Sequence, residues 1–409
     1  MALLGLCMIL VSTPLMALVS FVIIVRAPSK IRIYLPLIVL TFAFIAYCYE
    51  PTYSNDLSRY FNSLERLKTV PFSEAFSWAN DGLVVKNLLF WLIAKTQDKH
   101  ILPALVIGCL YGVTFYISAD SIESRYENLW KVLLIQIMLL PIYLATSNVR
   151  NILCFALLEL AVYRDAVQGK KNIITTLLYI LPCFIHMTGI IVVLVRFMVI
   201  LFHRHFRLGL ISTAVIPTFA SFIYSRLGTF HFSGNIGKIL NRIIWKSYAS
   251  LATSSDYAQS MQQSGYVNAC MAVVFVASVC LILLNYQYLD RVNKTGKDSR
   301  YYNLSIFSLV FCAITCIWIL SGAVKYWIFG VAVVISSGPV ISYYIRKWSE
   351  VRKFSRILLC SIVAMAVLRA GLELYFISGR IDLRDYGERL ATSNIYTVIF
   401  NLFRTLFSN

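Results

Sequence analysis

Apolar runs of about 15–25 residues recur along the whole chain, and short polar segments separate them. A run of this length predicts a helix that crosses a lipid bilayer, because helices and closed barrels are the structures that satisfy every backbone hydrogen bond in lipid. The predicted spans are residues 2–25, 33–49, 101–119, 132–147, 151–163, 172–187, 188–202, 208–224, 266–285, 301–320, 326–343 and 357–377. We therefore expect an all-α, polytopic membrane protein with about twelve transmembrane helices.

Two apolar stretches do not fit an ordinary span. Leu83–Ala94 has about 12 residues, which suits an interfacial or re-entrant helix. The run 172–202 is too long for one ordinary span and contains Pro182, His186 and Gly189. It therefore predicts two short spans with His186 near the outer turn, and a single tilted span is the alternative.

The polar gaps between the spans fall into two sets that differ in basic content. One set holds 19 Lys or Arg in 60 residues and comprises 26–32, 120–131, 164–171, 203–207, 286–300 and 344–356. The other holds 16 in 132 residues and comprises 50–100, 148–150, 225–265, 321–325 and 378–409. The positive-inside rule assigns the dense set to the cytoplasm. Residues 1–377 are then a single transmembrane domain, with outer loops 50–100 and 225–265 and an outer tail 378–409.

Composition supports this class. The chain has 409 residues, is 59% hydrophobic and 14% charged, and carries a formal net charge of +18. A soluble protein carries about a quarter charged residues. Because most Lys and Arg lie in the short gaps, topology and anionic lipid headgroups account for the positive charge. We expect membrane lipids and no nucleic acid as partners.

Charged residues inside the spans predict two ion pairs. Arg369 and Glu373 are one helical turn apart and should neutralise each other. Glu159 and Arg196 have no partner close in sequence, so they are expected to pair with one another across neighbouring spans.

Four separate segments bring polar residues to the predicted outer face. These residues are Asp56, Arg59 and Tyr60 in the first outer loop, Arg150 and Asn151 at the start of a span, His186 at an outer turn, and Lys325 and Tyr326 at the start of a late span. Each has an ordinary explanation when taken alone, such as a solvated ion pair, a snorkelling arginine or a helix-end histidine. Their occurrence on one face predicts a site.

Missing motifs restrict the chemistry of this site. The chain has no GxxxxGK[ST], HExxH or GxSxG motif and no evident Asp-x-Asp pair in the outer loops, so no nucleotide, metal or other cofactor is expected. The remaining guanidinium, imidazole, carboxylate and phenol groups suit glycosyl transfer from a lipid-linked diphosphate. Arginine can stabilise the departing diphosphate without a metal, and a histidine or aspartate can take the proton of the attacking hydroxyl.

His186 and Asp56 are the candidates for the proton acceptor. An unperturbed histidine has a pKa of about 6.5, against about 3.9 for an aspartate, so histidine is better matched to neutral pH. We therefore assign the base to His186 and substrate positioning to Asp56, and the reverse assignment stays open. Arg59, Tyr60, Arg150, Asn151, Lys325 and Tyr326 are expected to bind substrate.

At these residues the chain resembles the EpsG-type, Wzy-like polysaccharide polymerases. The resemblance covers roughly residues 30–345 and rests on SNDLSRY in the first outer loop, SNVRN at the start of a span, FIHMTG about 35 residues later, and AVKYWIF. Family members more often carry arginine before the tyrosine of the last element. Here Lys325 stands in that place, and lysine cannot form a bidentate fork with phosphate.

The resemblance implies a glycosyltransferase-type polymerase of the bacterial inner membrane with its active site facing the periplasm. Its substrates would be O-antigen or capsule repeat units carried on undecaprenyl pyrophosphate. It also implies an architecture related to the GT-C glycosyltransferases and a chain-length regulator as a partner.

Two other functions are compatible with a polytopic membrane protein. A flippase for lipid-linked sugars should show two similar halves and broken helices at mid-membrane, and neither is evident in the sequence. A membrane O-acyltransferase would rely on a histidine or serine site and would not explain several outer arginines.

Overall fold

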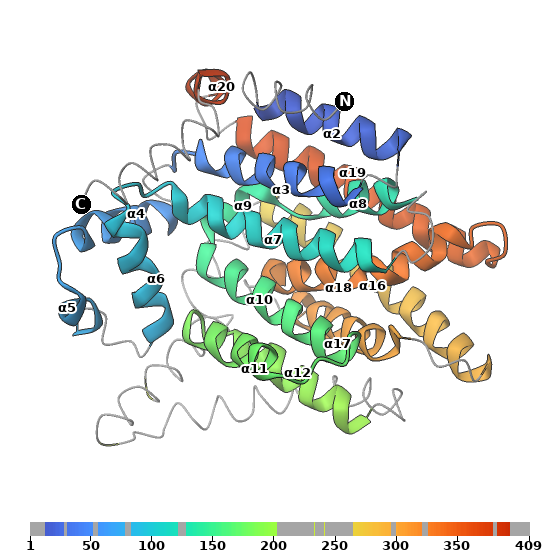
Figure 1. The fold of residues 1–409 in the computed structure, drawn as a ribbon. Coiled ribbons are helices and arrows are strands. Elements are labelled where there is room, and N and C mark those ends of the chain that lie inside the picture. Colours follow the sequence, from blue (N-terminus) through green and yellow to red (C-terminus); the bar gives the residue numbers. More distant parts are fainter. Residues whose placement is uncertain are drawn as a thin grey trace.

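The computed structural model describes residues 13–27, 31–51, 56–77, 83–121, 128–202, 265–295, 300–320, 326–378 and 383–392, together with the single residues 233 and 241. The regular secondary structure in these ranges is entirely helical (Figure 1). The prediction of an all-α protein is thus confirmed. The predicted span 208–224, nearly all of the loop 225–265 and most of the tail 378–409 lie outside the described residues.

In chain order, the helices are α2 (Thr13–Arg26), α3 (Ile31–Tyr47), α4 (Asp56–Leu67), α5 (Phe72–Ser77), α6 (Val84–Lys95), α7 (Ile101–Asp120), α8 (Leu129–Leu139), α9 (Ile142–Ser147), α10 (Val149–Ala166), α11 (Ile173–Ile180), the 3₁₀ turn η2 (Leu181–Phe184), α12 (Gly189–Phe202), α16 (Gly265–Thr295), α17 (Tyr302–Leu320), α18 (Tyr326–Arg346), α19 (Lys353–Ser378) and α20 (Leu383–Thr392).

Four described helices are long and apolar enough to cross a membrane. They are Ile101–Asp120, Gly265–Lys294, Tyr302–Leu320 and Lys353–Tyr375. Shorter apolar helices occupy Ile33–Tyr47, Leu129–Leu139, Ile173–Phe184 and Gly189–Phe202. These helices identify a membrane-embedded helical protein.

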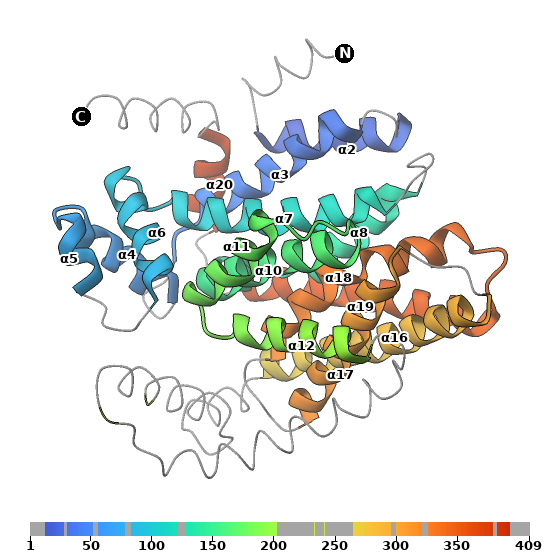
Figure 2. The ribbon, with the colours of Figure 1, turned by 60° about the horizontal axis from the view of Figure 1, so that its bottom comes forward.

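The described helices share one hydrophobic core, with α10 at its centre. Helix α10 contacts α7, α9, α11, α12, α17 and α18, and Figure 2 shows it among these helices. A helix surrounded in this way buries side chains on every face, and most residues of α10 are buried. Helices α4, α5 and α6 lie together at one end of the bundle (Figures 1 and 2).

The predicted break in the run 172–202 is confirmed. Helix α11 gives way to η2 and then to a turn before α12 begins at Gly189. Pro182 lies in η2 and supplies no N–H for a continuing helix. The short run Leu83–Ala94 also forms a helix, α6.

Helix α16 continues ten residues past its predicted end at 285. Asp290 and Lys294 form an ion pair with a separation of 2.7 Å in this extension. Such an i, i+4 pair supports a helix in polar residues, which the hydropathy pattern does not detect.

One predicted intramembrane ion pair is confirmed and the other is wrong. Arg369 Nη2 lies 3.4 Å from Glu373 Oε2. Arg196, in contrast, pairs with Asp165, with 2.7 Å between Nη2 and Oδ2. Glu159 lies six positions before Asp165 and therefore on a different face of α10, so Asp165 is the carboxylate that meets Arg196.

Candidate functional site

Helix α4 carries the first group of predicted site residues. Its buried face consists of Leu57, Phe61, Leu64 and Leu67, at the spacing of one side of a helix. This face packs against α6 and α9. Asp56 opens the helix and forms an ion pair with Arg59, and a carboxylate is favoured at a helix N-terminus by the helix dipole.

The next residue, Tyr60, connects α4 to α10. Arg150 Nε donates a hydrogen bond of 2.9 Å to the Tyr60 hydroxyl. The guanidinium carbon also lies 5.0 Å from the centre of the Tyr60 ring, a distance at which a cation is attracted to the ring face. Phe90 of α6 meets the Tyr60 ring edge-to-face, with 5.6 Å between ring centres. Tyr60 thus holds Arg150 through both its hydroxyl and its ring.

The protonation of Tyr60 follows from its surroundings. Burial raises the pKa of this phenol, and the nearby Arg150 opposes the rise only in part. The phenol therefore keeps its proton at neutral pH. Because its oxygen accepts from Arg150, its O–H can donate to another acceptor such as a phosphate or sugar oxygen.

Asn151, the neighbour of Arg150, connects α10 to the turn before α12. The Thr188 hydroxyl donates to Asn151 Oδ1 over 3.1 Å, and the same hydroxyl lies 2.8 Å from His186 Nδ1. The Thr188 backbone N–H also donates to Nδ1, over 3.2 Å. A backbone N–H can only donate, so Nδ1 accepts in this geometry, and the neutral imidazole carries its proton on Nε2.

A glycine allows this turn to approach α10. A Cβ atom at Gly189 would lie 2.7 Å from Cys154 Sγ and 2.9 Å from Leu158 Cδ1. Both distances are shorter than real Cβ contacts. The Cys154 thiol also donates to the His186 carbonyl over 3.4 Å. Gly189 therefore determines how closely His186 can lie to the start of α10.

Six of the eight predicted site residues thus form two linked groups. On α4, Tyr60 follows the Asp56–Arg59 pair and contacts Arg150 of α10, and the His186 turn contacts α10 at Asn151. Of the other two, Lys325 lies outside the described residues and Tyr326 opens α18. Thr188 was not among the predicted site residues, although it is the threonine of the FIHMTG segment. The spacing of a threonine two residues after a histidine could have identified Thr188 from the sequence, because such a hydroxyl can form a local hydrogen bond.

A second polar cluster lies where α3, α20 and the segment before α7 meet. His100, just before α7, has Nε2 at 3.2 Å from Glu50 Oε1, and Arg389 of α20 lies 2.9 Å from the same oxygen. The Tyr47 hydroxyl donates to Asp98 Oδ2 over 2.6 Å. These contacts join α3 and α20 to the segment before α7.

His100 is the titratable centre of this cluster. Burial lowers its pKa, although Glu50 and Asp98 oppose the change. Its Nδ1 is buried without a hydrogen-bond partner, which favours the neutral ring. Phe61 of α4 packs edge-to-face on this ring, with 5.0 Å between ring centres. The cluster therefore supports α4 directly beside Tyr60.

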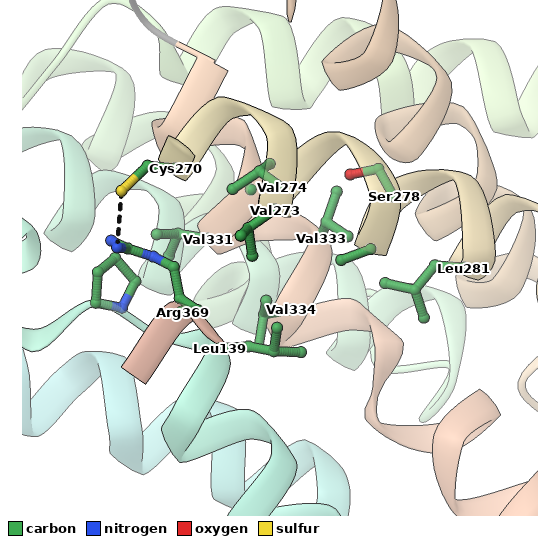
Figure 3. Close-up of a pocket in the computed structure, with 13 residues that line it drawn as sticks. Leu139, Cys270, Val273, Val274, Ser278, Leu281, Val331, Val333, Val334 and Arg369 are labelled. Atoms are coloured by element: carbon green, nitrogen blue, oxygen red, sulfur yellow. Dashed lines mark hydrogen bonds between the residues drawn. The ribbon is translucent and has the colours of Figure 1, made fainter. Parts of the chain in front are cut away.

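An apolar cleft between α8, α16, α18 and α19 is shown in Figure 3. Arg369 lies at one end, and its Nη1 donates to Cys270 Sγ over 3.1 Å. The free space is about 30 Å³, room for one or two water molecules. Because Arg369 is already paired with Glu373 and the cleft is nearly filled, we regard it as packing between helices.

The described residues contain no group of three or more His, Cys, Asp or Glu side chains placed to hold a metal ion. Comparisons with family models, with curated proteins and with solved structures found no match.

Proposed function

We propose that this chain is a metal-independent polysaccharide polymerase. It joins oligosaccharide repeat units carried on undecaprenyl pyrophosphate into O-antigen or capsular polysaccharide at the outer face of the bacterial inner membrane. The observation that carries the proposal is the pair Arg150–Asn151, which holds Tyr60 on one side and the His186 turn on the other. The same residues carry the resemblance to the EpsG-type, Wzy-like polymerases. The proposal includes about twelve spans and a GT-C-like architecture.

Arg150 is assigned to the diphosphate of a lipid-linked substrate. It is half-buried, and Tyr60 already holds its Nε, so the two Nη groups are oriented as one fork. Such a fork binds two phosphate oxygens at once. Tyr60 takes part in this binding region by holding Arg150. In the proposal Arg59, Tyr326 at the start of α18 and Lys325, which precedes it in the sequence, complete the region.

His186 is assigned to the acceptor sugar. Thr188, itself held by Asn151, orients the imidazole through Nδ1. In the proposal the ring reacts as the tautomer with its proton on Nδ1, donated to the Thr188 hydroxyl, so that Nε2 takes the proton of the attacking hydroxyl. As that proton moves, the hydroxyl oxygen bonds to the anomeric carbon of the donor and the bond from this carbon to the diphosphate oxygen breaks. The diphosphate leaves with the bonding electrons, and Arg150 stabilises its charge. Asp56 positions the sugar hydroxyls.

The proposal is tested with purified protein in liposomes supplied with lipid-linked repeat units and a chelator of divalent metals. The expected result is chain lengthening in the presence of the chelator. His186→Ala should slow it by about 10²–10⁴, the usual contribution of a general base. His203→Ala is a matched control, because His203 lies in the gap predicted to face the opposite side.

Other outcomes identify the alternatives. Normal lengthening by His186→Ala with an inactive Asp56→Asn would exchange the two roles. Movement of the lipid-linked unit between leaflets without lengthening would indicate a flippase, and acyl transfer to the sugar would indicate an acyltransferase. Either of the last two results overturns the proposed polymerase.

A further inference from the structure

A groove lies at the end of the bundle where α8 and α19 begin and α18 ends. Helix α8 contacts both α18 and α19 there, and Figure 1 shows the three helices. The groove is about 500 Å³ in volume, within the usual range of small-molecule sites. It is lined by Trp130, Lys131, Leu134, Ile135, Ile345, Trp348, Leu359, Cys360 and Val363.

The groove has an apolar floor and a rim that includes two tryptophans and Lys131. Leu134 and Val363, which are 37% and 38% exposed, belong to the floor. Trp130 lies in the first turn of α8, and Trp348 lies between α18 and α19. Tryptophan is enriched at this level of a membrane protein, where the hydrocarbon meets the headgroups. The floor is therefore placed to contact acyl chains.

Two cations stand beside the tryptophan rings. Lys131 Nζ lies 5.6 Å from the centre of the Trp130 ring, and Arg356 Cζ lies 5.8 Å from that of Trp348. Among the described residues neither cation forms an ion pair with a carboxylate, whereas Glu350 in the same segment is paired with Lys347 at 2.7 Å. Positive charge at the rim is thus left for an anionic ligand.

We propose that this groove is a binding site for an anionic diacyl phospholipid. The acyl chains lie on the apolar floor, and the phosphate lies between Lys131 and Arg356. Basic pockets between membrane helices bind anionic headgroups, each Lys or Arg contributing about 1 kcal/mol, or about five-fold in affinity. A zwitterionic lipid binds with lower affinity, because its own positive charge is repelled by the two basic residues. The site is independent of the proposed polymerase activity.

Cys360 provides a native reporter inside the groove. Of the described cysteines it is the one that is exposed. Its reaction with N-ethylmaleimide is measured in detergent micelles that contain phosphatidylglycerol, phosphatidylcholine or undecaprenyl phosphate at equal mole fraction. Mass spectrometry of the peptide that carries Cys360 gives the labelled fraction with time.

Phosphatidylglycerol should slow the labelling about ten-fold or more, and phosphatidylcholine much less. Lys131→Gln combined with Arg356→Gln should remove the preference for phosphatidylglycerol, a loss of about 25-fold when two contributions of about five-fold are multiplied. Lys170→Gln combined with Lys171→Gln removes the same charge from an exposed turn elsewhere and should keep the preference. The single variants at Lys131 and Arg356, each with an intermediate loss, provide the test if the double variant does not fold.

Four results would overturn the proposal. They are equal protection by both phospholipids, the same loss of preference in the Lys170 and Lys171 control, stronger protection by undecaprenyl phosphate, and protection that rises with protein concentration in lipid-free micelles. The third result would make the occupant a prenyl lipid, and the fourth would make it a second copy of this chain.

Discussion

The contact between Arg150 and Tyr60 leads to a double-mutant experiment on the proposed diphosphate site. Arg150→Lys keeps the positive charge but loses both the fork and the 2.9 Å bond from Nε to the Tyr60 hydroxyl. A hydrogen bond to a charged group contributes about 1.5–3 kcal/mol. Loss of one such bond in the transition state lowers the rate by about 10- to 150-fold.

Tyr60→Phe is the matched partner of this variant. It keeps the ring beside the guanidinium and the contact with Phe90, and loses the hydroxyl. If Tyr60 acts by holding Arg150, Tyr60→Phe should slow polymerisation about ten-fold, at the low end of the same range. In an Arg150→Lys background it should have little further effect, because the bond it removes is already absent.

The assay is the initial rate of chain lengthening in liposomes, with protein amount and thermal stability measured for each variant. Full activity of Arg150→Lys would show that the positive charge alone is sufficient and would refute bidentate phosphate binding by the guanidinium. Independent, fully additive losses would show that the Tyr60 hydroxyl contacts the substrate instead of holding Arg150.

Three further predictions concern the turn before α12 and the His100 cluster. Thr188→Val should lose activity and Thr188→Ser should keep it in the same assay, because the hydroxyl contacts Nδ1 of His186 and orients the imidazole. Equal activities of the two variants would contradict this positioning role. Gly189→Ala should lower the free energy of unfolding by about 1–3 kcal/mol through overpacking, seen as a lower melting temperature in detergent. Adding Cys154→Ala should restore part of this stability, because Cys154 Sγ is the atom nearest to the added Cβ. Burial lowers the pKa of His100, so the unfolded chain binds more protons than the folded protein, and the free energy of unfolding decreases as the pH falls below about 6.5. Melting temperatures measured across this pH range should depend less on pH in His100→Gln than in the unmodified protein. An unchanged pH dependence would contradict the reasoning.

Features that depend on local spacing could be predicted from the sequence. The length of the apolar runs predicts helices in a membrane, because a lipid environment excludes irregular backbone. Pro182 predicts the break before α12, because it has no N–H to donate. Arg369 and Glu373 are paired as expected, since residues four apart on a helix are neighbours whatever surrounds them.

The neighbours of each helix were decided by the tertiary structure. Periodicity identifies which face a residue occupies but not which helix packs against that face, so the sequence alone paired Arg196 with Glu159, whereas the fold pairs it with Asp165. In the candidate site, residues of four segments were expected on one side of the membrane. Only packing brings Tyr60 to Arg150, 90 residues away, and Thr188 to Asn151, 37 residues away. Contacts this distant in sequence depend on how whole helices fit together, and that fit follows from side-chain shapes across the entire core.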